Sequence, residues 1–239
     1  MMNFIDGEIL YFNKPLHWTS FKLVKTLRYQ LCQHLKVKKL KVGHAGTLDP
    51  LATGVMILCT GKKTKLIEEF QYQDKEYIAT IRLGATTPSF DLETEIDQEW
   101  TIDHLTKEMV EQKVQTFVGE IWQVPPVYSA VKVDGKRAYD LARAGKEDIE
   151  LKAKLLVIDE IELLSCNLPE IKIRVVCSKG TYIRALARDI GEALGVGAHL
   201  TALDRTRIGT VTLDQCLDGS QIAEFVDSVM NKQEINNKE

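Results

Sequence analysis

A forty-residue stretch without Asp or Glu separates Glu8 from Asp49 and constrains this chain more than any other feature. The stretch carries eight basic residues, at positions 14, 22, 25, 28, 36, 38, 39 and 41. It leads into the string GHAGTLDPLATG, residues 43–54, in which Asp49 is the one carboxylate. A positive segment of this kind attracts a polyanion through its phosphates, and a carboxylate there would repel them. A lone Asp before Pro is typical of a turn, but the whole glycine-punctuated string predicts a functional carboxylate.

Further motifs follow in order along the chain. They are NKP with TS within 13–20, DKEY at 74–77 leading into IRLG at 81–84, QVPPVYSAVK at 123–132, CSKGTYIR at 177–184 and GAHL at 197–200. With residues 43–54 they resemble, in order and spacing, the signatures of the bacterial tRNA pseudouridine-55 synthases, the TruB family. The resemblance covers roughly residues 8–210, and a set of ordered motifs is far more specific than a single pattern. One departure is His17-Trp18, where the family usually has Gly before the Thr-Ser pair.

The resemblance implies an α+β chain with the pseudouridine synthase fold: a mixed, bent β-sheet with a central RNA-binding cleft and flanking helices. We expect one catalytic domain over residues 1–232, with an RNA-contacting insertion near 123–146. Residues 233–239 are polar and expected to fray. Many family members carry a further C-terminal RNA-binding domain, and we expect none of ordinary size here.

The implied reaction is the isomerisation of uridine to pseudouridine at position 55, in the T loop of tRNA, after the base is flipped out of its stack. The resemblance makes Asp49 the nucleophile or base and Arg184 the cation that keeps it ionised. It assigns Tyr77 to stacking on the substrate base, with a phenol that can also shuttle a proton. Attack on C1′, attack on C6 and a glycal route all fit these residues.

The resemblance also implies substrate contacts outside the catalytic group. His44 fills the gap left by the flipped base, and Tyr182 closes the pocket wall. Leu203 contacts the base, and Lys14 either shapes the cleft floor or meets phosphate. By pattern alone, the two tyrosines and the leucine would be core residues.

Composition limits the partners and the chemistry. The net charge of −3 does not by itself indicate RNA, so the distribution of charge matters more than its sum. A second group of basic residues, at 172, 174, 179, 184 and 188, predicts together with the first a positive face. We expect the tRNA T-arm stem-loop as partner, no obligate protein partner, and a monomer. The five cysteines are scattered without a C-x-x-C pair, which argues against zinc and disulfides.

The predicted reaction is redox-neutral, so no metal and no cofactor is expected. No apolar run approaches the ~20 residues of a membrane span, and no signal peptide is evident. The chain is therefore expected to be cytoplasmic, without contact with a membrane.

Local patterns predict a mixture of strands and helices without a βαβ rhythm, which favours α+β. Strands are expected at 8–12, 77–83 and 171–177. Helices are expected from Thr19 or Ser20, from Asp103, and around 221–230. Another helix should be capped by Thr181 and ended by Gly195.

Three alternatives to a stand-alone tRNA enzyme are open. The first is a non-catalytic RNA-binding module, which would have no use for a buried carboxylate. The second is a guide-RNA-dependent relative, which would need protein partners. The third is a carboxylate hydrolase, which would need a second acid near Asp49, and Asp91 is the one candidate.

Overall fold

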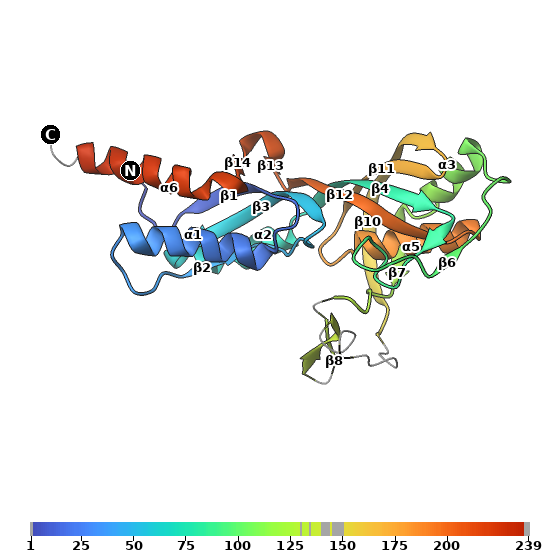
Figure 1. Ribbon diagram of the computed structural model, residues 1–239, viewed down its shortest axis with the longest axis horizontal. Coiled ribbons are helices and arrows are strands. Elements are labelled where there is room, and N and C mark those ends of the chain that lie inside the picture. The colour runs from blue at the N-terminus through green and yellow to red at the C-terminus, as the bar shows by residue number, and fades with distance from the viewer. Residues whose placement is uncertain (1, 130, 134, 140–143, 145–150, 237–239) are drawn as a thin grey trace. The chain divides into compact units, whose positions relative to one another are not determined.

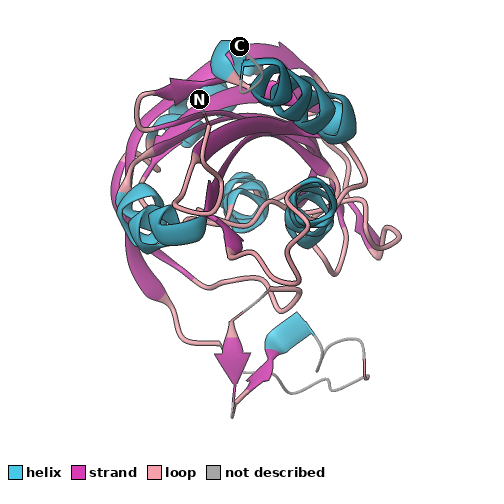
Figure 2. Ribbon diagram, turned by 90° about the vertical axis from the view of Figure 1, so that its left-hand side faces the viewer, coloured by secondary structure: helices cyan, strands magenta, loops and turns pink. Residues whose placement is uncertain are grey.

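The computed structural model describes residues 2–129, 131–133, 135–139, 144 and 151–236. Much of the expected insertion after residue 139, and Ala130, Ala142 and Arg143 of the family-like motifs, lie outside these residues. The chain forms two compact units, a first of Met1–Lys75 with Asp204–Glu239 and a second of Glu76–Leu203. Each unit combines strands with helices, drawn in magenta and cyan in Figure 2. The α+β prediction is therefore confirmed.

The first unit is built on β3 (Ala52–Thr60), whose apolar residues are almost all buried. β3 pairs antiparallel with β1 (Ile9–Lys14) and with β2 (Val42–His44). β1 also pairs in parallel with β14 (Leu217–Asp218). The strand predicted at 8–12 is thus confirmed as β1. The shorter elements of this unit are η1 (Gly61–Leu66), α2 (Ile67–Tyr72), β13 (Val211–Thr212), η2 (Leu213–Gln215) and η3 (Gly219–Gln221).

Two longer helices belong to the first unit, α1 (Ser20–His34) and α6 (Ile222–Asn236), and they lie side by side (Figure 1). Thr19 caps α1, since its side chain accepts a hydrogen bond from the Lys22 amide at 3.0 Å. The apolar face of α1 is buried, at Leu23, Val24, Leu27 and Leu31. The helix predicted around 221–230 is confirmed as α6, which continues into the stretch expected to fray.

The second unit contains β7 (Gly119–Gln123), β10 (Lys154–Asn167) and β11 (Glu170–Cys177), where β10 pairs antiparallel with both neighbours. β11 confirms the strand predicted at 171–177. β4 (Lys75–Leu83) lies next to β11 in the strand order and confirms the strand predicted at 77–83. Its alternate residues Tyr77, Ala79, Ile81 and Leu83 are buried. β12 (Ala198–Ile208) begins in this unit and ends in the first. Two small ribbons pair β5 (Ala85–Thr86) with β6 (Gln98–Glu99) and β8 (Lys132–Val133) with β9 (Lys136–Arg137).

Two helix starts in the second unit correct the predictions. α3 spans Lys107–Gln115 and begins after Thr106, whose hydroxyl accepts from the Met109 amide, so the start predicted at Asp103 is wrong. The buried face of α3 carries Val110 and Val114, whereas Met109 is 43% exposed. α5 (Ile183–Leu194) follows Tyr182, and its first turn has no side-chain cap. Thr181 instead donates its hydroxyl to the Ser178 carbonyl, whereas Gly195 ends α5 as predicted, with φ 75°.

Candidate active site

Asp49 lies on the loop that joins β2 to β3 in the first unit, and its side chain is half-buried. The Asp49 carbonyl accepts from the Ala52 amide at 3.1 Å, which closes a turn directly before β3. Two glycines permit this path, because Gly46 and Gly54 have φ of 107° and 116°. A Cβ on Gly54 would come within 2.3 Å of the Arg205 carbonyl oxygen. The glycine punctuation of the string therefore has a geometric cause.

The residue before Asp49 is fixed from α1. The Leu48 amide donates to the Ser20 hydroxyl at 2.8 Å, and the same hydroxyl donates back to the Leu48 carbonyl at 2.9 Å. The Leu48 side chain is also buried. Reciprocal bonds of this kind anchor the loop to the helix one residue before the carboxylate.

Lys14 is fully buried, at the end of β1. Its ammonium donates to the carbonyls of Trp18 at 2.6 Å, Pro15 at 2.9 Å and, more weakly, Pro50 at 3.5 Å. Burial lowers the Lys14 pKa to about 8, although the nearby Asp49 carboxylate opposes this shift. The ammonium thus faces the chain itself, which favours the cleft-shaping role over the phosphate contact.

His17 explains the departure from the family pattern before Thr19. Its φ of 65° lies in the left-handed region, where glycine is the usual residue. The His17 amide donates to the Pro50 carbonyl at 2.8 Å. The segment after β1 therefore holds the residue that follows Asp49.

His44 lies at the end of β2 and is half-buried. Burial lowers the His44 pKa. A hydrogen bond with the Gly46 backbone raises it, whereas the positive charge of Arg205 lowers it further. The neutral form of the His44 ring is therefore more favoured than that of a free imidazole.

Arg184 and Asp91 form a buried ion pair in the second unit. Arg184 Nε lies 3.5 Å from Asp91 Oδ2, and the side chains are 5% and 6% exposed. The guanidinium also donates to the carbonyls of Ser89 at 3.1 Å and Tyr128 at 2.8 Å. Asp91 in turn accepts from the Ser89 hydroxyl at 2.6 Å and the Glu93 amide at 2.9 Å. Sequence reasoning considered Asp91 as a hydrolase acid and missed this role, since the two residues lie far apart along the chain.

The remaining predicted residues also belong to the second unit. Tyr77 is buried on β4, with 8% exposure, and Leu203 is buried on β12 with 9% exposure. Tyr182 is half-buried before α5, and its amide donates to the Gln123 side chain at 2.9 Å. Gln123 belongs to the motif at 123–132, so this bond joins two of the family-like motifs.

The predicted site residues thus divide between the two units. The first unit holds Lys14, His44 and Asp49, whereas the second holds Tyr77, Tyr182, Arg184 and Leu203. Within the first unit Lys14 and Asp49 interact electrostatically. The pairing of Asp49 with Arg184 joins residues of different units and stays a prediction.

The three arginines of the second basic group are paired with acids, whereas Lys172 and Lys179 are exposed, so the predicted positive face is corrected for the arginines alone. Arg174 forms ion pairs with three glutamates, at positions 76, 160 and 162, with distances of 3.0, 2.8 and 3.6 Å. Arg184 is buried against Asp91, and Arg188 lies 2.6 Å from Asp189. Neighbouring acids neutralise these arginines, which a pattern of basic residues alone does not reveal.

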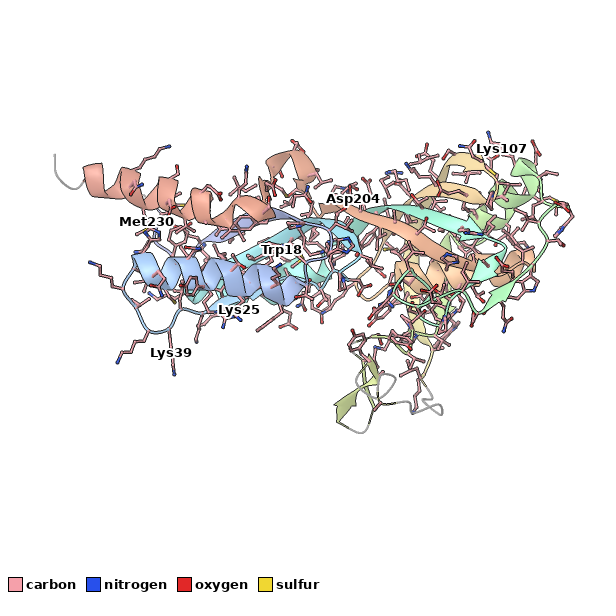
Figure 3. The ribbon with its side chains drawn as sticks, viewed as in Figure 1. Trp18, Lys25, Lys39, Lys107, Asp204 and Met230 are labelled. Carbon is pink, nitrogen blue, oxygen red and sulfur yellow. The ribbon has the colours of Figure 1, made fainter. Side chains whose placement is uncertain are left out.

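Sequence reasoning also missed lysines that extend the first basic stretch. The Gly61 amide donates to the Lys41 carbonyl at 2.9 Å, so η1 begins where the basic stretch ends. We call the exposed side chains of both segments the lysine edge; they are Lys36, Lys38, Lys39, Lys41, Lys62, Lys63 and Lys65. Figure 3 shows Lys39, and Lys25 on α1, extending away from the ribbon. The sequence does contain a signal for the second segment, because its lysines follow the Asp49 loop within ~20 residues.

Neither a metal site nor a membrane-spanning helix is found among the described residues. They contain no group of three or more His, Cys, Asp or Glu placed to hold a metal ion. None of their helices is long and apolar enough to cross a membrane. The predicted independence from metals and cofactors rests on the redox-neutral chemistry and stays a prediction.

Comparison with known proteins identifies related chains. Residues 33–183 match the TruB family pseudouridylate synthase N-terminal domain, and residues 184–236 match the tRNA pseudouridylate synthase B C-terminal domain. The chain is 73% identical over 226 residues to tRNA pseudouridine synthase B of Bacteroides fragilis, covering 95% of this chain and 97% of that protein. It is 51% identical over 216 residues to the protein of the same name in Flavobacterium johnsoniae, covering 90% and 94%.

Two solved structures share the fold. One is from a Cbf5-Nop10-Gar1 complex, with a TM-score of 0.67, 27% identity, and coverage of 93% of this chain and 55% of that one. The other is from an H/ACA RNP bound to a substrate RNA containing 2'-deoxyuridine, with a TM-score of 0.66, 25% identity, and coverage of 93% and 54%. This chain spans about half the length of those two. These likenesses confirm the predicted fold, and the sequence matches show that the chain belongs to the TruB family of pseudouridylate synthases.

Proposed function

We propose that this chain converts uridine to pseudouridine at position 55, in the T loop of tRNA, with Asp49 as the nucleophile or base. Pseudouridine formation in tRNA itself follows from the family and from relatives named tRNA pseudouridine synthase B at up to 73% identity. The observation that carries the Asp49 assignment is its setting. A half-buried carboxylate lies on a rigid, glycine-bounded loop, beside a buried ammonium that favours its ionised form.

The reaction breaks the N1–C1′ bond and forms a C1′–C5 bond, and a proton leaves C5 while N1 gains one. The atoms and electrons balance without an oxidant or a reductant. In the proposed site Asp49 starts the reaction, by attack on C1′, by attack on C6 or by taking the C2′ proton on a glycal route. Arg184 supplies the fixed cation, since Asp91 and two carbonyls already hold its guanidinium rigidly.

The other site residues have proposed roles in holding the base. Tyr77 stacks on it, an interaction worth about 1–3 kcal/mol for a base on an aromatic ring. Tyr182 and Leu203 line the pocket, and His44 takes the place of the flipped base. Lys14 acts by supporting the loop around Asp49.

The proposed partner is the T-arm stem-loop, bound by a monomer in the cytoplasm without an obligate protein partner. The lysine edge supplies the exposed positive charge that this binding requires. The guide-RNA-dependent alternative has support from the two solved structures, because both come from multi-component assemblies. Their identity of 25–27% is far below that of the tRNA enzymes, which favours the stand-alone reading.

The decisive experiment incubates the protein alone with an unmodified tRNA transcript and maps pseudouridine at single-nucleotide resolution. We expect one pseudouridine, at position 55, and none in a transcript with cytidine there. Pseudouridine at another position would contradict the T-loop assignment, and no product without added proteins would favour the guide-RNA-dependent alternative. A T-arm hairpin should also react. A loss of more than about a thousandfold, or ~4 kcal/mol of transition-state binding, would show that recognition extends beyond the arm.

A further inference from the structure

Arg205 is a fully buried arginine on β12, in the first unit, with 1% exposure. Arginines are almost never fully buried unless they are paired. Among the described residues no carboxylate forms an ion pair with Arg205; its hydrogen bonds go to three backbone carbonyls and the Met56 sulfur. Burying a charge in this way is costly, so the position calls for a specific explanation.

The three carbonyls belong to the Asp49 loop and the strand that follows it. Nε donates to Val55 at 2.9 Å, Nη2 to Gly46 at 3.3 Å, and Nη1 to Thr47 at 3.5 Å. Val55 is on β3, whereas Gly46 and Thr47 precede Asp49 by three and two residues. One planar guanidinium therefore ties the entry of the loop to its exit.

Residues of the first unit hold the loop at other points as well. Ser20 binds Leu48 directly before the carboxylate, and Lys14 reaches the carbonyl of Pro50 directly after it. Arg205 completes this set, because its side chain binds the carbonyls of residues 46 and 47. The backbone around Asp49 is thus held from three separate elements.

Arg205 also places fixed positive charge beneath the loop. Its charge, like burial, lowers the pKa of Lys14, whereas Asp49 raises it, so the three groups share one electrostatic environment. An arginine keeps its proton at any working pH, whereas a lysine in such a site can lose it.

We propose that Arg205 is a positioning residue for Asp49: its guanidinium locks the two ends of the loop together and keeps the carboxylate at the reacting position. This inference rests on the proposed role of Asp49. Arg205 contacts no substrate, and its effect on the reaction passes through the loop backbone.

The test is Arg205→Lys, which keeps a basic side chain but cannot reach three carbonyls in one plane. The matched control is Arg207→Lys, on the same strand, where the guanidinium donates to the Gly209 carbonyl at 2.9 Å. Three quantities are measured for each: the single-turnover rate at saturating tRNA, the tRNA dissociation constant and the unfolding temperature. We expect Arg205→Lys to lower the rate on the order of 100-fold, with tRNA affinity within about threefold of wild type. The control should keep the wild-type rate.

A rate within about threefold of wild type, or an affinity loss that accounts for the whole effect, would overturn the inference. If Arg205→Lys does not fold, the variant Gly46→Ala tests the positioning role instead. Its new Cβ would lie 3.6 Å from Arg205 Nη1, an ordinary van der Waals contact, but at a φ of 107° the added side chain strains the backbone, so the substitution shifts the acceptor carbonyl of residue 46 while the arginine itself is kept. Gly46→Ala should show the same loss of rate with retained affinity, and a wild-type rate would refute the role. Failure of the proposed function would appear separately, as wild-type protein that forms no pseudouridine at position 55.

Discussion

Arg184 and Asp91 are joined across 93 residues of sequence by a buried contact of 3.5 Å between Nε and Oδ2. Removing one partner of a buried ion pair leaves an uncompensated charge and costs about 3–5 kcal/mol. We expect Asp91→Asn to lower both the free energy of unfolding and the single-turnover rate. Denaturant unfolding and pseudouridine formation measure the two effects. The control is Asp97→Asn, an exposed aspartate that accepts from the Thr86 hydroxyl at 2.6 Å, and equal losses in both variants would contradict the prediction.

Arg184→Lys should be severely damaging although it conserves charge. The guanidinium serves Asp91 and the carbonyls of Ser89 and Tyr128 together, and an ammonium cannot match that planar arrangement. We expect the single-turnover rate to fall by more than about 100-fold. Arg188→Lys, one turn further along α5, is the matched variant. Near-normal turnover by Arg184→Lys would show that the planar contacts are dispensable.

Asp49→Asn should abolish turnover and leave tRNA binding nearly intact, since the amide keeps the shape of the side chain but cannot act as nucleophile. We expect the rate to fall by more than about a thousandfold, with pseudouridine formation and tRNA affinity measured on the same preparation. Asp214→Asn, an exposed change in the same unit, serves as control. Residual activity within tenfold of wild type would remove Asp49 from the proposed role.

Binding of tRNA should weaken steeply with salt, despite the net charge of −3. Each phosphate contact contributes roughly 0.7–0.9 to the slope of log affinity against log salt. Lys63→Gln with Lys65→Gln, on the lysine edge, should make the slope shallower, whereas Lys107→Gln with Lys172→Gln, in the second unit, should not. Equal slopes for both double variants would refute the lysine edge as the tRNA-binding surface.

The lowered pKa of Lys14 should make the free energy of unfolding depend on pH. Its folded pKa of about 8 lies below the ordinary 10.5, because burial outweighs the attraction of Asp49. Between these values the unfolded chain still binds a proton that the folded chain has released. Wild-type stability should therefore rise with pH relative to Lys14→Met, by at most about 1.4 kcal/mol per pH unit, and the difference should be flat below pH 8.

Denaturant unfolding of both proteins from pH 7 to 10 measures this term. Lys62→Met, which removes an exposed lysine of the same unit, is the control. Parallel stability curves for wild type and Lys14→Met would show that the Lys14 ammonium does not titrate in this window.

Local sequence patterns predicted the helices and strands in which apolar residues recur at regular spacing on one face. α1 was found because Thr19 can cap it and its apolar residues recur at helical spacing. The strand at 77–83 was found because its residues 77, 79, 81 and 83 are apolar or aromatic and alternate with the others, and these four are the buried ones. The start of α3 was missed because Asp103 and Thr106 are both good caps, and only the packed structure selects one.

By itself, the sequence determined the α+β class, the family and the loop that carries Asp49, because each depends on residue types at fixed spacing along the chain. Only the tertiary structure decided which charged side chains are paired with acids or buried, and which are exposed to a partner. Arg174 and Arg188 look like RNA-binding residues in the sequence, yet neighbouring carboxylates neutralise them. Lys14 and Arg205 look like surface residues, yet both are buried and bind backbone carbonyls around the loop. The energy of a charge depends on its solvent and its partners in space, and folding brings those partners from distant parts of the chain.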